Sequence, residues 1–190
     1  MGGIEALEVL APGPLTTVQD LGRYGFGRYG VPPSGAVDPF SMRAANLLVG
    51  NREGEAVLEI TLMGFKARAV RDLNIAVTGG DLQPRLNGEA LGMWRSHAVK
   101  AGDVLAFGRP RTGFRAYLAL GGGIGVEPVL GSRSTNLASG FGGFEGRALR
   151  KGDRLLCAFP PSGIRESGIS FREDSIPRYD GNPFLRVLPG

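Results

Sequence analysis

Cysteine and histidine are almost absent from the sequence, with one residue of each among 190. Because Cys157 is the sole thiol, no intramolecular disulfide can form; this indicates a reducing compartment, and we expect a cytoplasmic protein. His97 and Cys157 cannot supply a conventional zinc site by themselves, so we expect no bound metal. The apolar run LLCAF around Cys157 predicts a core thiol rather than a nucleophile.

Routine catalytic motifs are also missing. The sequence contains no Gly-Lys dipeptide, which excludes a Walker A loop, and no Gly-x-Ser-x-Gly, which excludes a nucleophile elbow. The run LGGGIG at 120–125 lacks the Gly-x-Gly-x-x-Gly spacing and precedes no long helical pattern, so it is not a dinucleotide fingerprint. We expect neither a signal peptide nor a membrane span, and no membrane partner.

Lysine is scarce as well: three lysines accompany 19 arginines, and the formal net charge is +4. An arginine excess suits bidentate binding of carboxylate or phosphate, although a GC-rich coding bias is the simpler explanation. The arginines are scattered along the chain without a basic run or interleaved aromatics. We therefore expect no nucleic-acid partner.

Glycine, in contrast, is abundant, with 32 residues, more than twice the roughly 7% of average usage. The glycines follow no fixed period and separate short apolar runs, as in a fold with many tight turns. These runs predict strands at 7–11, 15–18, 56–61, 73–78, 98–100, 104–107, 115–120 and 154–159. Many short strands with one helix favour a mainly β fold, a closed or nearly closed barrel.

The one helix begins at Asp38-Pro39, with aspartate as the N-cap and proline at the first helical position. Phe40, Ala44, Leu47 and Leu48 recur with helical spacing and predict an apolar stripe toward the core. The residues off this stripe, Ser41, Arg43 and Asn46, are expected on a helix face that is available for polar interactions.

Apolar residues become rare after the last predicted strand. We expect a domain over 1–161 and a linker or exposed excursion over 162–183, where Pro, Arg, Asp and Ser dominate. The final stretch, 184–190, reads FLRVLPG and begins like LEVLAPG at 7–13, which predicts the start of a fresh strand in a chain that looks cut short.

Polar residues gather in three constellations that suit an anion or amide site better than a complete catalytic apparatus. The first lies around Asp20 in TTVQDLGR, the second around the PPSG turn and the helix start, and the third in GSRST behind the glycine run. Ordinary turn and capping roles explain several members equally well. The candidates are Gln19, Asp20 and Arg23; Ser34, Gly35, Arg43 and Asn46; Gly122 and Gly123; and Ser132, Arg133, Ser134 and Thr135.

Four blocks of the sequence carry a family resemblance: TTVQDLGRYGFGRYGVPPSGAVDPFSMRAANLLVGN, AVLEITLMG, RAYLALGGGIGVEPVLGSRST and GRALRKGD. In this order they resemble the biotin-dependent carboxyltransferase family, which includes the C subunit of 5-oxoprolinase (the second subunit of allophanate hydrolase) and the carboxyltransferase region of urea carboxylase. The resemblance covers the first part of a family member. It implies a cyclophilin-like β-barrel over 1–161, with 184–190 as the start of a truncated second barrel.

The resemblance also implies roles for the matching residues. Asp20, Arg43 and Arg133 are our candidate catalytic groups: Asp20 as a base, the arginines to stabilise carbonyl or anionic charge. Gln19, Arg23, Ser34, Gly35, Asn46, Gly122, Gly123, Ser132, Ser134 and Thr135 are expected to bind a small-molecule amide substrate. Glu59 is explained equally well by a structural charge pair.

Three functions follow as expectations. The leading one is part of a bacterial ATP-dependent 5-oxoprolinase, inactive alone, which converts 5-oxo-L-proline to L-glutamate together with the A-like and B-like subunits of that enzyme; ATP is then handled through the complex. The second is a role in carboxyl transfer from carboxybiotin to urea or a related amide, with biotin on a separate carrier because Met-Lys-Met is absent. The third is a regulatory module that binds a kinase-inhibitor protein; a prolyl isomerase rests on fold analogy alone.

Overall fold

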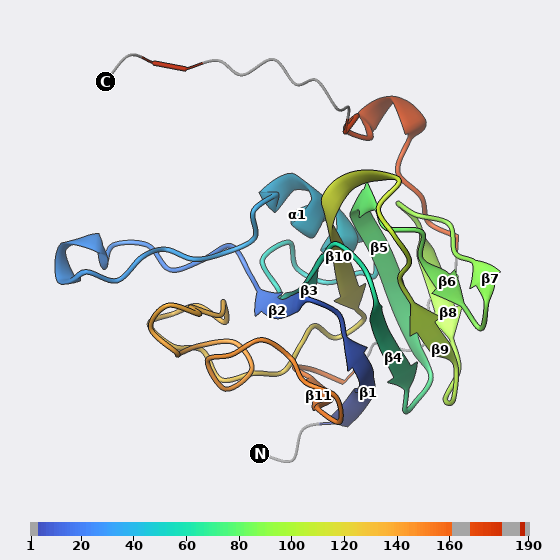
Figure 1. Ribbon diagram of the computed structural model, residues 1–190, viewed down its shortest axis with the longest axis horizontal. Coiled ribbons are helices and arrows are strands. Elements are labelled where there is room, and N and C mark those ends of the chain that lie inside the picture. The colour runs from blue at the N-terminus through green and yellow to red at the C-terminus, as the bar shows by residue number, and fades with distance from the viewer. Residues whose placement is uncertain (1–3, 161–167, 180–186, 189–190) are drawn as a thin grey trace.

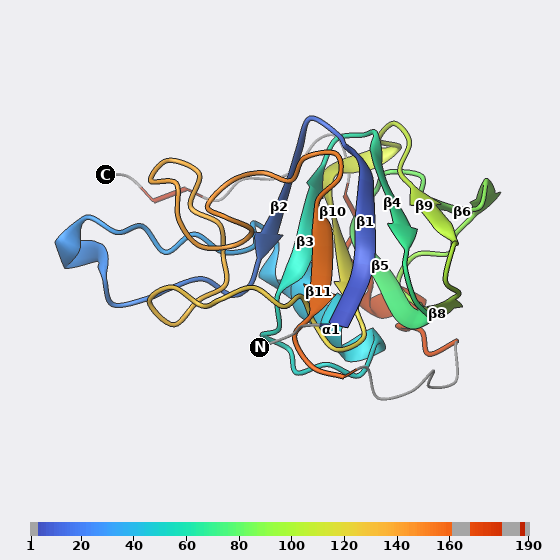
Figure 2. The ribbon, with the colours of Figure 1, turned by 90° about the horizontal axis from the view of Figure 1, so that it is seen from below.

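The computed structural model describes residues 4–160, 168–179 and 187–188, and in this part the chain is mainly β with one α-helix, as predicted. The strands form two antiparallel sheets (Figures 1 and 2). The six-stranded sheet has the order β11 (Arg154–Cys157), β1 (Ile4–Pro12), β4 (Phe65–Ala69), β9 (Val104–Ala106), β6 (Arg85–Leu86) and β7 (Glu89–Ala90). The five-stranded sheet has the order β2 (Leu15–Gln19), β3 (Val57–Thr61), β10 (Thr112–Leu120), β5 (Leu73–Asp81) and β8 (Ser96–Val99).

The mainly β fold class is confirmed, and of the expected closed or nearly closed barrel the structure shows the open form. Within the described ranges, no ladder of paired strands joins the two sheets into a continuous ring. The eight expected strands are present, and β4, β6 and β7 are additional to them. In β4 the exposed Lys66 and Arg68 alternate with buried Phe65, Ala67 and Ala69, so the strand has the period-two pattern but little apolar character.

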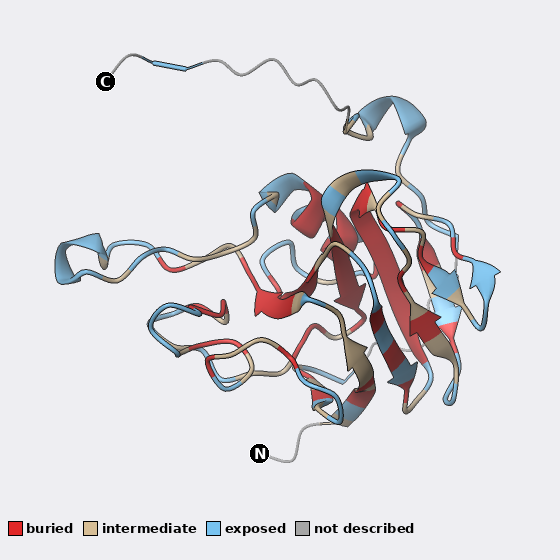
Figure 3. Ribbon diagram, in the orientation of Figure 1, coloured by how far each residue is buried: buried red, intermediate tan, exposed pale blue. Residues whose placement is uncertain are grey.

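The main core lies between the sheets, and a second core lies on the opposite face of the five-stranded sheet. Successive residues of a strand point to opposite faces, so Leu58 and Leu118 enter the main core while Val57 and Tyr117 enter the second. The second core is covered by α1 (Pro39–Leu48). Figure 3 shows the resulting burial along β5 and along the second half of β10.

The helix begins as predicted, with the Asp38 side chain accepting a hydrogen bond from the Ser41 amide at 3.0 Å. The predicted apolar stripe is confirmed only for Ala44 and Leu48, which are buried. Phe40 and Leu47 are 47% and 49% exposed, while Ser41 and Asn46 are fully buried. The helix is rotated from the expected orientation because its buried polar groups have partners in the fold. The Ser41 carbonyl, for example, accepts a hydrogen bond from Thr78.

Two long connections, one after β2 and one between β10 and β11, project from the same end of the sheets. The loop after β2 contains the 3-10 helix η1 (Gly27–Tyr29) and extends away from the body, and the loops between β10 and β11 lie beside its base in both views (Figures 1 and 2). The segment 168–179, part of the expected linker, contains η2 (Glu173–Ser175) and pairs with the domain through the Arg95–Ser170 bridge. Apart from 187–188, the expected strand at 184–190 lies outside the described residues.

Candidate functional site

The first and third polar constellations meet around one carboxylate. Asp20, which is 8% exposed, accepts hydrogen bonds from the Gly22 amide at 2.7 Å and the Arg133 amide at 2.6 Å. It also accepts from the hydroxyls of Ser132, at 2.6 Å, and Ser134. A buried carboxylate with four donors is a structural centre that joins two loops more than 100 residues apart in sequence. Its role as a base stays a prediction.

Glycines allow the two sides of the projecting loop to approach each other. Gly22 has φ +92°, and a Cβ there would lie 2.9 Å from the Ser34 carbonyl oxygen. Gly35 has φ +97°, and its Cβ would lie 3.0 Å from the Leu21 carbonyl oxygen. The PPSG turn therefore packs directly against the start of the loop, and the Gly35 amide donates to the Gln19 side chain at 3.2 Å.

Arg23 is buried and links these loops through hydrogen bonds. It is 2% exposed and donates to the Ser34 hydroxyl at 3.1 Å and the Val129 carbonyl at 3.3 Å, as well as to the Ser134 carbonyl. Its guanidinium lies over the Phe141 ring. Burial lowers the pKa of Arg23, and the nearby Asp20 charge opposes that shift. Each nitrogen of the Arg23 guanidinium thus donates to a group of the protein, and contact with a substrate stays a prediction.

Beside this network lies a polar groove of about 260 Å³. It opens on the α1 side of the five-stranded sheet, where alternate residues of β2, β3 and β10 point the same way. Four predicted site residues line it, Gln19, Ser34, Gly35 and Thr135. They are joined by Leu15, Thr17, Val37, Glu59, Arg115, Asn136 and Leu137.

The wall of the polar groove carries a largely buried ion pair. Glu59 has a side chain 5% exposed and accepts from Arg115 at 2.5 Å, from Tyr117 at 2.9 Å and from the Val37 amide at 2.8 Å. Burial, and then the Glu59 charge, raises the pKa of Tyr117, which stays a neutral donor. Arg115 has a side chain 34% exposed, and no hydrogen bond within the described residues uses its Nε or Nη2. These donors are available to a ligand.

Asn136 also lines the polar groove. The residue is 4% exposed, its Oδ1 accepts from the Ser139 amide at 3.2 Å, and its Nδ2 has no partner among the described residues. A buried amide nitrogen without a partner costs about 1–3 kcal/mol. The free donors of Arg115 make the groove suited to a carbonyl or carboxylate oxygen.

The remaining predicted residues lie away from the polar groove. Arg43 is exposed on α1 and faces Glu53 at 3.8 Å. Asn46 is buried and donates to the carbonyls of Glu53, at 3.2 Å, and Glu55, at 2.7 Å. The expectation of a polar face at Asn46 is thus wrong, because these bonds hold the turn after the helix.

Arg133 and the glycine run meet on another side of the Asp20 network. Arg133 donates to the Val126 carbonyl at 3.1 Å and lies 3.6 Å from Glu55. Gly123 packs against the Glu55 side chain, and Gly122 lines a hollow of about 260 Å³ with Glu55 and other residues. The structure thus brings Gly122, Gly123 and Arg133 to Glu55 rather than to the polar groove.

Sequence reasoning missed Arg115 and Asn136 and left Glu59 as a structural charge. The available signal was a single charged residue in each of two apolar runs, Glu59 in AVLEIT and Arg115 in RAYLAL. In the paired strands β3 and β10, Arg115 lies two positions along from the residue opposite Glu59. Asn136 had no such signal. Within the described residues, no three His, Cys, Asp or Glu side chains cluster as metal ligands would. None of the described helices is long and apolar enough to span a bilayer.

Comparison with known proteins agrees with the family resemblance. The carboxyltransferase domain family, subdomains A and B, matches residues 29–190. The chain is 46% identical over 149 residues to the C subunit of 5-oxoprolinase from Escherichia coli K12, covering 78% of this chain and 48% of the relative. It is 45% identical over 156 residues to the urea amidolyase of Lachancea kluyveri, covering 82% of this chain and 8% of that protein. The crystal structure of the K. lactis urea amidolyase superposes with a TM-score of 0.85 at 41% identity, over 96% of this chain and 11% of that one. The chain therefore spans about half the length of the E. coli relative.

Proposed function

The chain belongs to the carboxyltransferase domain family, and on this premise we propose that it is a subunit of an ATP-dependent 5-oxoprolinase, which converts 5-oxo-L-proline to L-glutamate. The observation that carries the proposal is the 46% identity to the C subunit of a bacterial 5-oxoprolinase, over 78% of this chain. The protein would contribute substrate binding and positioning.

The polar groove supplies groups that suit a cyclic amide. A lactam presents a carbonyl oxygen, which the free donors of Arg115 would bind. Charge that develops on that oxygen during ring opening would be stabilised by the guanidinium, the role that the sequence suggests for Arg133. Glu59 holds Arg115 in place at 2.5 Å and keeps it oriented without substrate.

Under this proposal the chain acts with the A-like and B-like subunits of the enzyme. The sequence has no Walker A loop, so ATP would be bound and used by the complex rather than by this chain alone. This chain without its partners would be inactive. A cytoplasmic setting fits the need for ATP and the buried, unpaired Cys157.

The test is ATP hydrolysis by the protein reconstituted with its A-like and B-like partners, with and without 5-oxoproline. We expect hydrolysis to depend on 5-oxoproline and to produce glutamate. Arg115→Met should reduce glutamate formation about 100-fold, the usual effect of losing one donor to transition-state charge. The matched control is Arg68→Met, which removes an exposed arginine paired with Glu8 on β1 and should leave the rate unchanged.

Two results would contradict the proposal. If 5-oxoproline stimulates no hydrolysis while the three proteins still associate, the 5-oxoprolinase function fails. If hydrolysis depends on 5-oxoproline but Arg115→Met behaves like Arg68→Met in the assembled complex, the function stands and the polar groove is not its site.

A second candidate is carboxyl transfer to urea or a related amide, favoured by the 45% identity to a urea amidolyase and by the superposition on another. Urea is also a planar amide and would meet the same donors. Biotin would then arrive on a separate carrier protein. ATP-dependent carboxylation of urea in the presence of biotin carboxylase and carrier, without any response to 5-oxoproline, would support this candidate over the first.

A further inference from the structure

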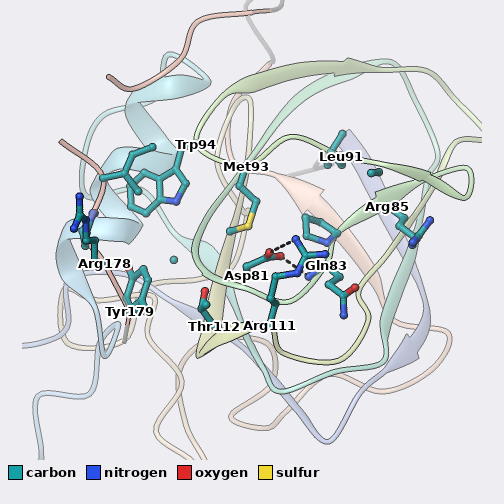
Figure 4. Close-up of a pocket in the computed structure, with 15 residues that line it drawn as sticks. Asp81, Gln83, Arg85, Leu91, Met93, Trp94, Arg111, Thr112, Arg178 and Tyr179 are labelled. Carbon is teal, nitrogen blue, oxygen red and sulfur yellow. Dashed lines mark hydrogen bonds and ion pairs between the residues drawn. The ribbon is translucent and has the colours of Figure 1, made fainter. Parts of the chain in front are cut away.

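A cavity of about 550 Å³ lies apart from the polar groove. It is bounded by the ends of β5 and β10, the residues around Trp94, and 176–179 (Figure 4). None of the residues singled out from the sequence lines it. Its volume is within the range of small-molecule sites, roughly 300–1,000 Å³.

The backbone around this cavity is irregular. The β5–β10 register shifts between Thr112 and Ala116, and a Cβ on Gly80 would lie 2.8 Å from the Thr112 carbonyl oxygen. Two lining residues, Gln83 and Trp94, have φ of +50° and +57°. Such conformations cost about 1–3 kcal/mol each. The fold therefore maintains the shape of the cavity at a cost in stability.

Hydrogen bonds enforce this shape. The Trp94 amide donates to the Val77 carbonyl at 2.8 Å, and the Trp94 carbonyl accepts from the Phe171 amide at 2.9 Å. The Gln83 amide donates to Asp81 at 2.8 Å. Both strained residues are thus held in place before any ligand arrives.

The lining combines an apolar wall with a cationic rim. Leu91, Met93 and Trp94 supply the wall, and Arg85, Arg111 and Arg178 supply the rim. Among the described lining residues Asp81 is the only acidic one, and it lies 3.3 Å from Arg111. Two of the three arginine charges therefore have no carboxylate partner within the lining.

We propose that the arginine-rimmed cavity binds a small organic carboxylate with an apolar ring. The ring would pack against Trp94 and Met93, and the carboxylate would bind the arginine rim through charge-assisted hydrogen bonds. The proposal does not depend on the reaction assigned to the polar groove.

Trp94 is the only tryptophan of the chain, so its fluorescence reports directly on this cavity. The 190-residue protein is titrated with benzoate, with its neutral analogue benzamide, and with inorganic phosphate. We expect a saturable change with benzoate and a dissociation constant of about 1 mM or lower. Benzamide and phosphate should each bind at least about tenfold more weakly, because one lacks the charge and the other lacks the ring.

Arginine variants then assign the site. Arg85→Met, Arg111→Met and Arg178→Met change exposed side chains and should leave the fold intact. At least one should weaken benzoate binding about tenfold without affecting benzamide, while the control Arg68→Met, on β4, should not. The proposal is overturned if benzoate gives no saturable change, if benzamide or phosphate binds as tightly, or if all three variants bind benzoate like the unchanged protein.

Discussion

The ion pair between Glu59 and Arg115 provides the sharpest test of how the polar groove is built. Breaking a fully buried pair by removing one partner costs about 3–5 kcal/mol, whereas an exposed pair contributes at most about 1 kcal/mol. Here the glutamate side chain is 5% exposed and the arginine side chain 34%. We therefore expect Arg115→Met to reduce the free energy of unfolding by about 2 kcal/mol, between these limits.

The measurement is thermal and urea denaturation of the variant beside Arg68→Met. For a chain of this length, about 2 kcal/mol corresponds to a fall in Tm of about 4–8 °C. Arg68 and Glu8 also form an ion pair, at 3.1 Å, but their side chains are 47% and 27% exposed. That pair should contribute no more than about 1 kcal/mol.

A double-mutant cycle isolates the pairwise interaction. In the native protein one Glu59 oxygen accepts from Arg115, and the other accepts from Tyr117 and the Val37 amide. The glutamine of Glu59→Gln has one oxygen and one NH2 group, so its NH2 group must face donors on one of these two sides. Once Arg115 is also replaced, one of these conflicts disappears. The double variant should therefore be less destabilised than the sum of the single variants by about 1–2 kcal/mol. Additivity within about 0.5 kcal/mol, or an Arg115→Met variant as stable as Arg68→Met, would refute the reasoning.

Three further predictions concern other parts of the fold. Tyr179→Phe removes the hydroxyl that ties 168–179 to the start of α1, so this segment should exchange its amide protons faster while global stability falls by about 1 kcal/mol. Burial lowers the pKa of His97, so the unfolded chain takes up a proton first as the pH falls. The free energy of unfolding should therefore decline below about pH 6.5, and denaturation of His97→Gln should lack that decline. Gly143→Ala should lower Tm by about 4–8 °C, because the added Cβ would overlap the Thr135 side chain at φ +54°; a Tm within about 1 °C of the unchanged protein would disprove the close packing.

Several features could be predicted from the sequence because they are local. Asp38-Pro39 predicts the helix start through the preferences of two adjacent residues, and period-two apolar runs predict eight of the strands. The apolar setting of Cys157 likewise predicts its burial, which the structure confirms. Such signals depend on the nearest few residues, so no partner elsewhere in the chain is needed to read them.

The orientation of the helix could not be predicted in this way. Its spacing indicated Phe40 and Leu47 for the core, yet both are half exposed, while Asn46 is buried by hydrogen bonds to carbonyls beyond the helix. A buried polar residue is acceptable only where distant groups satisfy it, and periodicity carries no information about those groups.

The same distinction between local signals and long-range contacts applies to the candidate sites. By itself the sequence determined the family, the strand-rich fold and the residues Asp20 and Ser132–Thr135 as a polar set worth testing. Only the tertiary structure decided that Asp20 joins two loops, that Arg115 and Glu59 face one polar groove, and that Arg85, Arg111 and Arg178 surround another cavity. These groups come from strands and loops far apart in the chain, and their proximity arises from strand pairing and loop packing, which no local pattern encodes.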